Sequence, residues 1–126
     1  MARTHSTRFL NAVEDAKTRI TEISAEEVEE ARKGDAPYVL IDVREDREFA
    51  VDSCAGAVHI GKGILERDVE GAFPDTAQTL VLYCGGGFRS ALAADSLRGM
   101  GYSDARSMAG GIRAWRNLGY PLDSRK

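Results

Sequence analysis

An apolar run that leads directly into a cysteine and three glycines most constrains how this chain can fold. Residues 79–83 are followed by Cys84 and then by Gly85, Gly86 and Gly87, after which Phe-Arg-Ser opens a helical pattern. A short apolar run bounded by glycine predicts a buried strand, and the residues after it predict a tight loop and a helix N-terminus. The sequence therefore places a thiol at the carboxyl end of a buried strand, where open α/β sheets gather their functional sites.

The glycine loop after this strand suits a negatively charged sulfur. Glycine adopts positive φ angles without strain, so successive backbone N–H groups can point into one hollow. The helix N-terminus that follows adds partial positive charge at the same place. Because both features favour an anion, we expect Cys84 to be a reactive thiolate. An inert buried cysteine before an ordinary turn is the alternative that these residues alone leave open.

Size and charge narrow the classes of protein that fit this chain. With 126 residues, 43% of them hydrophobic and 29% charged, we expect one globular domain with a single core. The net charge of −3 is small and both signs are mixed along the chain, so we expect no nucleic-acid partner. The sequence shows neither a leader pattern nor a membrane span, so we expect no membrane partner and a cytoplasmic location.

The cysteines and histidines argue against a metal centre or a disulfide framework. Cys54 and Cys84 form no CxxC pair, and the histidines are His5 and His59. We therefore expect no metal site and no cofactor. A reducing compartment would keep Cys84 available as a thiol.

Alternating strands and short helices predict an α/β fold whose parallel sheet is covered by helices on both faces. Strands are expected at residues 21–23, 38–43, 56–60, 79–83 and 104–108. Helices are expected at residues 7–20, 25–33, 45–50, 88–100 and 112–118. Residues 61–75 are expected to form a loop, with a helical turn at residues 64–67.

The N-terminal helix is amphipathic. A single stripe of apolar side chains recurs at helical spacing: Phe9, Leu10, Val13, Ala16 and Ile20. We expect this stripe to cover its own domain, and pairing with a second copy in a homodimer is the alternative left open. The expected division is a helical extension at residues 1–20 and a domain at residues 21–126.

Two of the predicted strands end in groups that can carry charge. Asp42 lies near the end of the strand at residues 38–43, and Cys84 follows the strand at residues 79–83. If these strands are neighbours, the Asp42 carboxylate can reach Arg89 and hold the glycine loop in shape. The alternative left open is that Asp42 is a turn residue and Arg89 a solvated residue at the start of the helix.

Several separate motifs together resemble the rhodanese-like domain family. They occur in the family's order over about residues 21–121: residues 40–44 with Glu48 and Phe49, residues 56–60, residues 82–84 with Gly87, Arg89 and Ser90, and residues 110–112 with Trp115. The N-terminal helix and residues 61–66 are similar to single-domain bacterial members. The resemblance implies a five-stranded, mainly parallel sheet flanked by helices, and a sulfurtransferase activity.

The resemblance also implies a mechanism and a set of site residues. In such enzymes the equivalent of Cys84 is the nucleophile, which attacks the outer sulfur of a donor such as thiosulfate, releases sulfite and keeps a persulfide. A small thiol, cyanide or a protein then accepts the sulfur, so ping-pong kinetics are expected. The residues expected to bind the substrate form the loop: Gly85, Gly86, Gly87, Phe88 and Arg89.

Two other functions fit parts of the same pattern. The family's phosphatase relatives have a loop one residue longer, whose larger ring fits phosphate or arsenate, whereas four residues separate Cys84 from Arg89 here. The resemblance therefore disfavours a phosphatase-like or arsenate-handling site. A persulfide carrier or sulfur-sensing module with little turnover on small molecules stays open, because the same motif serves both roles.

Departures from the family's pattern leave details of the function open. Cys54 could resolve the persulfide into a disulfide, although we expect it to be a small packing residue. Gly85 leaves the loop without a charged side chain next to the nucleophile, so a doubly charged donor needs a cation from elsewhere. Arg89 could supply this charge or pair with Asp42, but could not easily do both.

Four further residues are interpreted as structural. We expect His59 to support its strand rather than act as an acid or base, and Trp115 to belong to the core. Arg44 and Glu48 are expected to brace the fold through a local ion pair.

Overall fold

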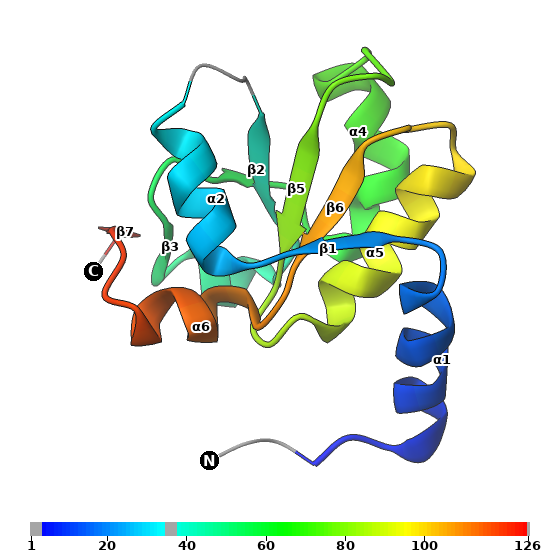
Figure 1. The fold of residues 1–126 in the computed structure, drawn as a ribbon, viewed down its shortest axis with the longest axis horizontal. Helices are drawn as coiled ribbons and strands as arrows, with labels where there is room; N and C mark the ends of the chain where they lie inside the picture. Colours follow the sequence, from blue (N-terminus) through cyan, green and yellow to red (C-terminus); the bar gives the residue numbers. More distant parts are fainter. Residues whose placement is uncertain (1–3, 35–37, 126) are drawn as a thin grey trace.

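A parallel sheet forms the centre of the fold (Figure 1). The structure is a computed structural model that describes residues 4–34 and 38–125. Within these residues the central sheet has five strands in the order β1 (Thr21–Ile23), β6 (Ala105–Met108), β5 (Leu80–Tyr83), β2 (Val39–Asp42) and β4 (Val58–His59). Every neighbouring pair is parallel. The predicted α/β fold with a five-stranded parallel sheet is confirmed.

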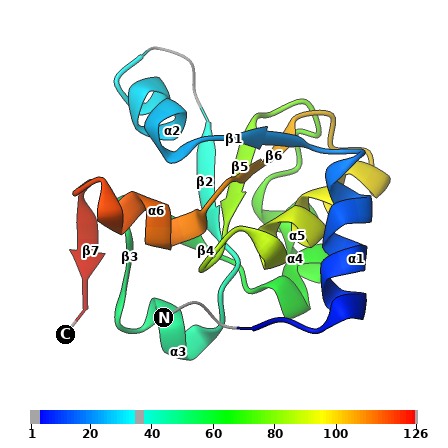
Figure 2. The ribbon, with the colours of Figure 1, turned by 60° about the horizontal axis from the view of Figure 1, so that its bottom comes forward.

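Helices cover both faces of this sheet (Figure 2). One face packs on α2 (Ala25–Arg32) and α6 (Gly111–Asn117), and the other packs on α4 (Leu65–Ala72) and α5 (Phe88–Gly99). Ser24 begins α2 with the predicted capping box, because its hydroxyl accepts from the Glu27 N–H and the Glu27 carboxylate accepts from the Ser24 N–H. The sheet thus divides the core into two layers, here called the α4/α5 layer and the α2/α6 layer.

The central strand β5 contributes side chains to both layers. Leu80, Leu82 and Cys84 lie in the α4/α5 layer, whereas Val81 and Tyr83 lie in the α2/α6 layer. All five residues are at most 2% exposed. Strands buried on both faces are apolar throughout rather than alternating, which explains why the run before Cys84 is continuous.

Helix α1 (Thr7–Lys17) packs on the outer side of α5. Val13 and Ala16 of the apolar stripe are buried, as expected of a helix that covers its own domain, while Leu10 stays 37% exposed. Beyond the helix, Arg19 pairs with Asp95 of α5, with Nη2–Oδ2 at 2.8 Å. The boundary between an extension and a domain at residue 20 stays a prediction, and residues 1–3 lie outside the described part of the chain.

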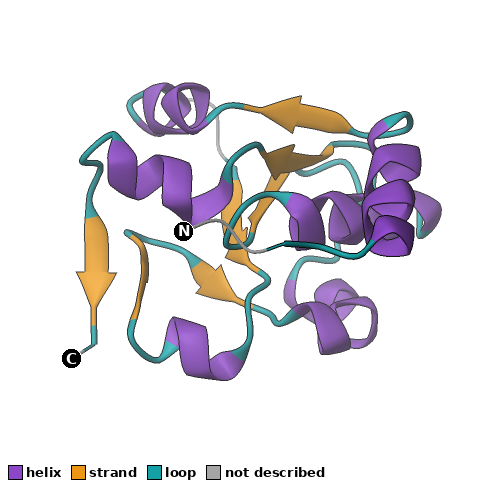
Figure 3. Cartoon of the chain, turned by 90° about the horizontal axis from the view of Figure 1, so that it is seen from below, coloured by secondary structure: helices purple, strands orange, loops and turns teal. Residues whose placement is uncertain are grey.

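Three elements differ from the sequence prediction. The expected loop at residues 61–75 contains a 3-10 turn (Lys62–Ile64) and the eight-residue helix α4. Only two of its apolar side chains, Leu65 and Val69, are buried in the core, so its helical periodicity is too short to recognise. The short strands β3 (Asp52–Cys54) and β7 (Leu122–Ser124) form an antiparallel pair apart from the main sheet (Figure 3).

Other elements are shorter than predicted. The helix expected at residues 7–20 ends at residue 17, the strand expected at residues 56–60 is the two-residue β4, and the helix expected at residues 45–50 is the single turn α3 (Asp46–Phe49). Among the described residues, no helix combines the length and the apolar character needed to cross a membrane.

Candidate active site

Cys84 directly follows β5, and its sulfur lies inside the loop that leads to α5. We call residues 84–89 the Cys84 loop. The backbone N–H of Gly87 donates to Sγ at 3.1 Å, and the N–H of Ser90 donates to it at 3.4 Å. Gly87 has a φ of +99°, which only glycine adopts without strain and which turns its N–H toward the sulfur. The loop therefore places two backbone donors around one buried sulfur atom.

A pair of buried hydroxyl groups supports the sulfur from the sheet side. The Ser90 hydroxyl lies 3.5 Å from Sγ of Cys84 and 2.9 Å from the hydroxyl of Ser107 on β6. Both serines are fully buried. The sequence pattern included Ser90 as part of a motif but gave no role to Ser107, whose only signal is a polar residue in a predicted strand.

Helix α6 packs against the Cys84 loop from the other side. The N–H of Ile112 donates to the carbonyl oxygen of Cys84 at 2.9 Å, and the N–H of Arg113 donates to that of Gly85 at 3.1 Å. Gly111 makes this approach feasible: its φ is +58°, and a Cβ atom there would overlap the Cys84 carbonyl oxygen and lie 2.6 Å from that of Gly85. The Gly110-Gly111 pair is thus part of the site's framework, a role that the sequence reasoning did not assign.

The far end of the Cys84 loop is held by an ion pair with α3. Arg89 Nη1 lies 2.8 Å from Oε1 of Glu48, and Nη2 lies 3.3 Å from Oε2. Both side chains are about one third exposed. The hydrogen bond from Arg89 lowers the pKa of Glu48, and the same bond raises the pKa of Arg89. Arg89 is therefore a charged residue whose guanidinium is already partly occupied.

The predicted pair between Asp42 and Arg89 is wrong. Asp42 instead accepts from Nη2 of Arg44 at 2.9 Å and from the hydroxyl of Tyr83 at 2.6 Å. The strands β2 and β5 are neighbours as predicted, but Asp42 is in register with Tyr83, which belongs to the α2/α6 layer. Because α5 and Arg89 belong to the opposite face, the Asp42 carboxylate braces the sheet and not the loop. The predicted ion pair between Arg44 and Glu48 is wrong for the same reason.

Phe88 is turned toward the N-terminal helix. Its ring makes edge contacts with His5 at 4.8 Å and Phe9 at 6.2 Å between ring centroids. The predicted substrate-binding residue at this position thus connects the Cys84 loop to the N-terminal segment.

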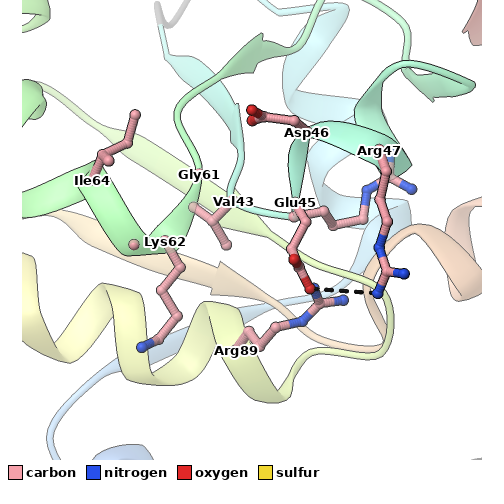
Figure 4. A pocket seen from close by; sticks show the side chains of 10 residues that line it. Val43, Glu45, Asp46, Arg47, Gly61, Lys62, Ile64 and Arg89 are labelled. Carbon is pink, nitrogen blue, oxygen red and sulfur yellow. Dashed lines mark ion pairs between the residues drawn. The ribbon is translucent and has the colours of Figure 1, made fainter.

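A pocket of about 470 Å³ opens beside the loop (Figure 4). Its walls are residues 43–47, residues 61–64 and Arg89. The figure shows Lys62 and Arg47 on either side of Arg89 in this view, with Arg47 paired to Glu45 at 3.7 Å. Among the described residues, the Lys62 ammonium has no ion-pair partner. The pocket therefore offers a polar approach to one side of the loop, with Arg89 in its wall.

Cys54 lies in a different part of the core from Cys84. Both cysteines are free, but Cys54 belongs to the α2/α6 layer and Cys84 to the α4/α5 layer, on opposite faces of the sheet. Burial raises the pKa of the Cys54 thiol to about 12, so it is protonated at neutral pH. These observations agree with a packing role for Cys54.

The remaining residues singled out by the sequence lie away from the sulfur. The ring of His59 stacks on Phe49 with centroids 4.4 Å apart, and its Nε2 is 2.9 Å from the carbonyl oxygen of Arg44. Trp115 is fully buried, and its indole N–H donates to the carbonyl oxygen of Pro121. Among the described residues, no cluster of three or more His, Cys, Asp or Glu side chains is placed to hold a metal ion.

Known proteins resemble this chain over most of its length. The model of the rhodanese-like domain family matches residues 24–118. The thiosulfate sulfurtransferase GlpE of Pseudomonas putida is 33% identical over 102 residues, which cover 81% of this chain and 89% of that protein.

Solved structures extend the likeness to the whole fold. A protein of unknown function from Rhodopseudomonas palustris, described as a possible tyrosine phosphatase, has a TM-score of 0.84 at 27% identity and covers 98% of this chain and 99% of its own. A thiosulfate sulfurtransferase of Pseudomonas aeruginosa has a TM-score of 0.83 at 22% identity, over 94% of this chain and 23% of its own. The last likeness concerns the fold alone.

Proposed function

Because the chain belongs to the rhodanese-like domain family and is an enzyme of the sulfurtransferase type, we propose that Cys84 carries sulfur from donor to acceptor as a persulfide. The observation that supports this most directly is the pair of N–H groups, from Gly87 and Ser90, that donate to Sγ. Hydrogen bonds to the charged form of an acid favour that form, so these donors stabilise a Cys84 thiolate. A nucleophile stabilised in this way needs no histidine base.

The first half-reaction loads the enzyme. The Cys84 thiolate attacks the outer sulfur of a donor such as thiosulfate, a new S–S bond forms, and the old one breaks so that sulfite leaves with the bonding electrons. No proton changes place, and the negative charge moves to the terminal sulfur of the persulfide. Backbone N–H groups of the Cys84 loop are pre-organised donors for this charge, in the manner of an oxyanion hole.

The second half-reaction unloads it. Cyanide attacks the terminal sulfur and leaves as thiocyanate, which returns the Cys84 thiolate, and a thiol or a protein acceptor takes the same sulfur. We assign the pocket beside Arg89 as the approach for small acceptors, because it adjoins the loop and is lined by polar side chains. Two half-reactions through one covalent intermediate give ping-pong kinetics.

A phosphatase reaction is the second candidate, favoured by the description of the Rhodopseudomonas palustris protein. Phosphoryl transfer needs cations directed at the phosphate oxygens. Here both terminal nitrogens of Arg89 contact Glu48, and four residues separate Cys84 from Arg89. Both features favour sulfur transfer. Hydrolysis of p-nitrophenyl phosphate that is lost in Cys84→Ser would reverse this preference.

One experiment tests the persulfide directly. The protein is incubated with thiosulfate, its intact mass is measured, and cyanide is then added while thiocyanate is followed. We expect one added sulfur atom in the wild type and in Cys54→Ser, and none in Cys84→Ser. Sulfur gain that persists in Cys84→Ser would refute the proposal. Loading followed by steady thiocyanate production indicates an enzyme acting on small molecules, whereas loading with little turnover indicates a carrier.

A further inference from the structure

Arg113 places an unneutralised cation against the Cys84 loop. Its Nη1 and Cζ atoms lie 3.6 Å and 3.9 Å from the point where a Cβ atom of Gly86 would stand. The residue is exposed, and among the described residues its guanidinium has neither an ion-pair partner nor a hydrogen-bond acceptor. The third residue of α6 therefore brings a full positive charge to the middle of the glycine loop.

The position of this cation is fixed by the backbone. The N–H of Arg113 itself donates to the carbonyl oxygen of Gly85, and the neighbouring N–H of Ile112 donates to that of Cys84. The Cα atom of Arg113 is thus held two hydrogen bonds from the nucleophile. Replacing the side chain leaves both bonds in place, so the charge can be removed without undocking α6.

Other cations around the loop are neutralised. Arg89 is bound to Glu48, and Arg116, one turn after Arg113, is bound to Asp52 with Nη1–Oδ2 at 2.6 Å. Lys17, which lies 5.8 Å from the centre of the Phe88 ring, has Glu22 as its partner at 3.7 Å. Lys62 is unpaired but stands in the wall of the pocket rather than against the glycines.

Glycine at positions 85 and 86 leaves the loop without a charge of its own and leaves space above it. An edge carbon of the Phe88 ring, Cε2, lies 3.9 Å from the same Gly86 point that the Arg113 guanidinium approaches. An apolar neighbour strengthens the attraction between a cation and an anion by excluding water. This arrangement suits a small anion that is held at the mouth of the loop while its outer sulfur faces Cys84.

We propose that Arg113 binds the anionic end of the sulfur donor, so that the site takes donors whose leaving group is an anionic sulfur oxide such as sulfite. The inference rests on the function proposed for Cys84 and names the donor class of that site. When the thiolate attacks thiosulfate, three negative charges meet in one place. Arg113 offsets this repulsion, and it stabilises the dianion that leaves with the electrons of the broken S–S bond.

The two half-reactions separate this role from a structural one. Loading by thiosulfate brings a dianion to the loop, whereas unloading by dithiothreitol uses an uncharged dithiol, which leaves as a cyclic disulfide while the transferred sulfur departs as hydrogen sulfide. Removal of the Arg113 charge should therefore slow loading and leave unloading nearly unchanged. Each rate is measured in a single turnover by intact mass.

The variants are Arg113→Gln, Arg113→Lys and the matched control Arg98→Gln. Arg98 carries the same charge near the end of α5, roughly 15 Å along the helix from the loop, where it pairs with Asp95 on the surface. We expect loading by thiosulfate to slow about tenfold in Arg113→Gln, the loss typical of one charge-assisted contact, and to be partly restored in Arg113→Lys. Arg98→Gln should load at the wild-type rate.

Each outcome decides the matter. Loading at the wild-type rate in Arg113→Gln overturns the inference while leaving the persulfide itself intact. Equal slowing of loading and unloading also overturns it, because it would mean a damaged loop. A wild-type protein that gains no sulfur from thiosulfate refutes the proposed function instead, so the two failures are distinct.

Discussion

Glu48 and Arg89 join α3 to the Cys84 loop through two hydrogen bonds, at 2.8 Å and 3.3 Å, between residues that are 41 positions apart in the sequence. The pair holds the end of the loop from outside, while α6 holds its beginning through the carbonyl oxygens of Cys84 and Gly85. The loop is thus fixed at both ends by elements that follow other strands of the sheet. This geometry makes the position of the sulfur depend on contacts far from it in sequence.

Replacing Glu48 with glutamine should loosen the loop. We expect Glu48→Gln to lower the rate of sulfur loading about fivefold and to cost about 1 kcal/mol of unfolding free energy, as for other half-exposed ion pairs. Rates from intact mass and unfolding in urea measure the two effects. Unchanged loading together with an unchanged midpoint in urea would show that the pair fixes nothing.

The same pair predicts how stability depends on pH. Arg89 holds the pKa of Glu48 below its usual range, so the pair's contribution to stability is fully present above the ordinary glutamate pKa of about 4.3. This contribution is lost as the pH falls through the lowered pKa of the folded state. The difference in melting temperature between the wild type and Glu48→Gln should be constant from neutral pH to about pH 5 and should then narrow. A difference that widens on acidification would contradict the assignment.

Local patterns explain why much of the fold could be predicted. The continuous apolar run of β5, the capping box at Ser24 and the glycine after each strand depend only on nearby residues. Helix α4 was missed because only Leu65 and Val69 face the core. The pair β3 and β7 was missed because their stability comes from pairing between segments far apart in the chain, and β7 is exposed along its length.

The site could be predicted only where one segment builds it. Cys84 and the glycines that surround it are contiguous, so their role was visible in the sequence. The partner of Arg89 depends on which face of the sheet each carboxylate occupies, and Asp42 and Glu48 are equally good candidates by charge. The register that pairs Asp42 with Tyr83 decides the matter, and no local pattern reports that register.

The burial of Cys54 predicts that its thiol takes no part in the reaction. Because burial raises its pKa to about 12 and because it lies on the other face of the sheet from Cys84, Cys54→Ala should load and unload sulfur at the wild-type rate. The variant should lose about 1 kcal/mol of stability, since it removes a fully buried sulfur atom. Mass spectra after thiosulfate treatment provide the measurement, and a Cys54–Cys84 disulfide in the wild type would argue for a resolving role.

Gly111 should be intolerant of any side chain. A Cβ atom there would overlap the carbonyl oxygen of Cys84, and the φ of +58° is itself unfavourable for alanine. Gly111→Ala is expected to cost about 3 kcal/mol and to abolish most sulfur loading, because α6 can no longer reach the loop. Gly99, at the end of α5, has open space around its Cβ position, so Gly99→Ala is the control and should stabilise the protein by roughly 0.5 kcal/mol. Equal behaviour of the two variants would rule out the close approach of α6.

Asp42 and Glu48 should respond differently to the loss of their charge. Asp42 is fully buried, and its carboxylate binds both the Arg44 guanidinium and the Tyr83 hydroxyl, so Asp42→Asn leaves a buried cation without its counter-ion. Such a change costs about 3 kcal/mol, against about 1 kcal/mol for Tyr83→Phe, which removes one hydrogen bond and leaves the ion pair.

Neither variant reaches the Cys84 loop, so sulfur loading per folded molecule should match the wild type at a temperature well below the melting transition. Glu48→Gln should show the reverse pattern, with a small loss of stability and slower loading. Measuring unfolding in urea and loading by thiosulfate on the three variants separates the two carboxylates. Slower loading in fully folded Asp42→Asn would restore Asp42 as a brace of the loop, because its carboxylate would then influence the sulfur across the sheet.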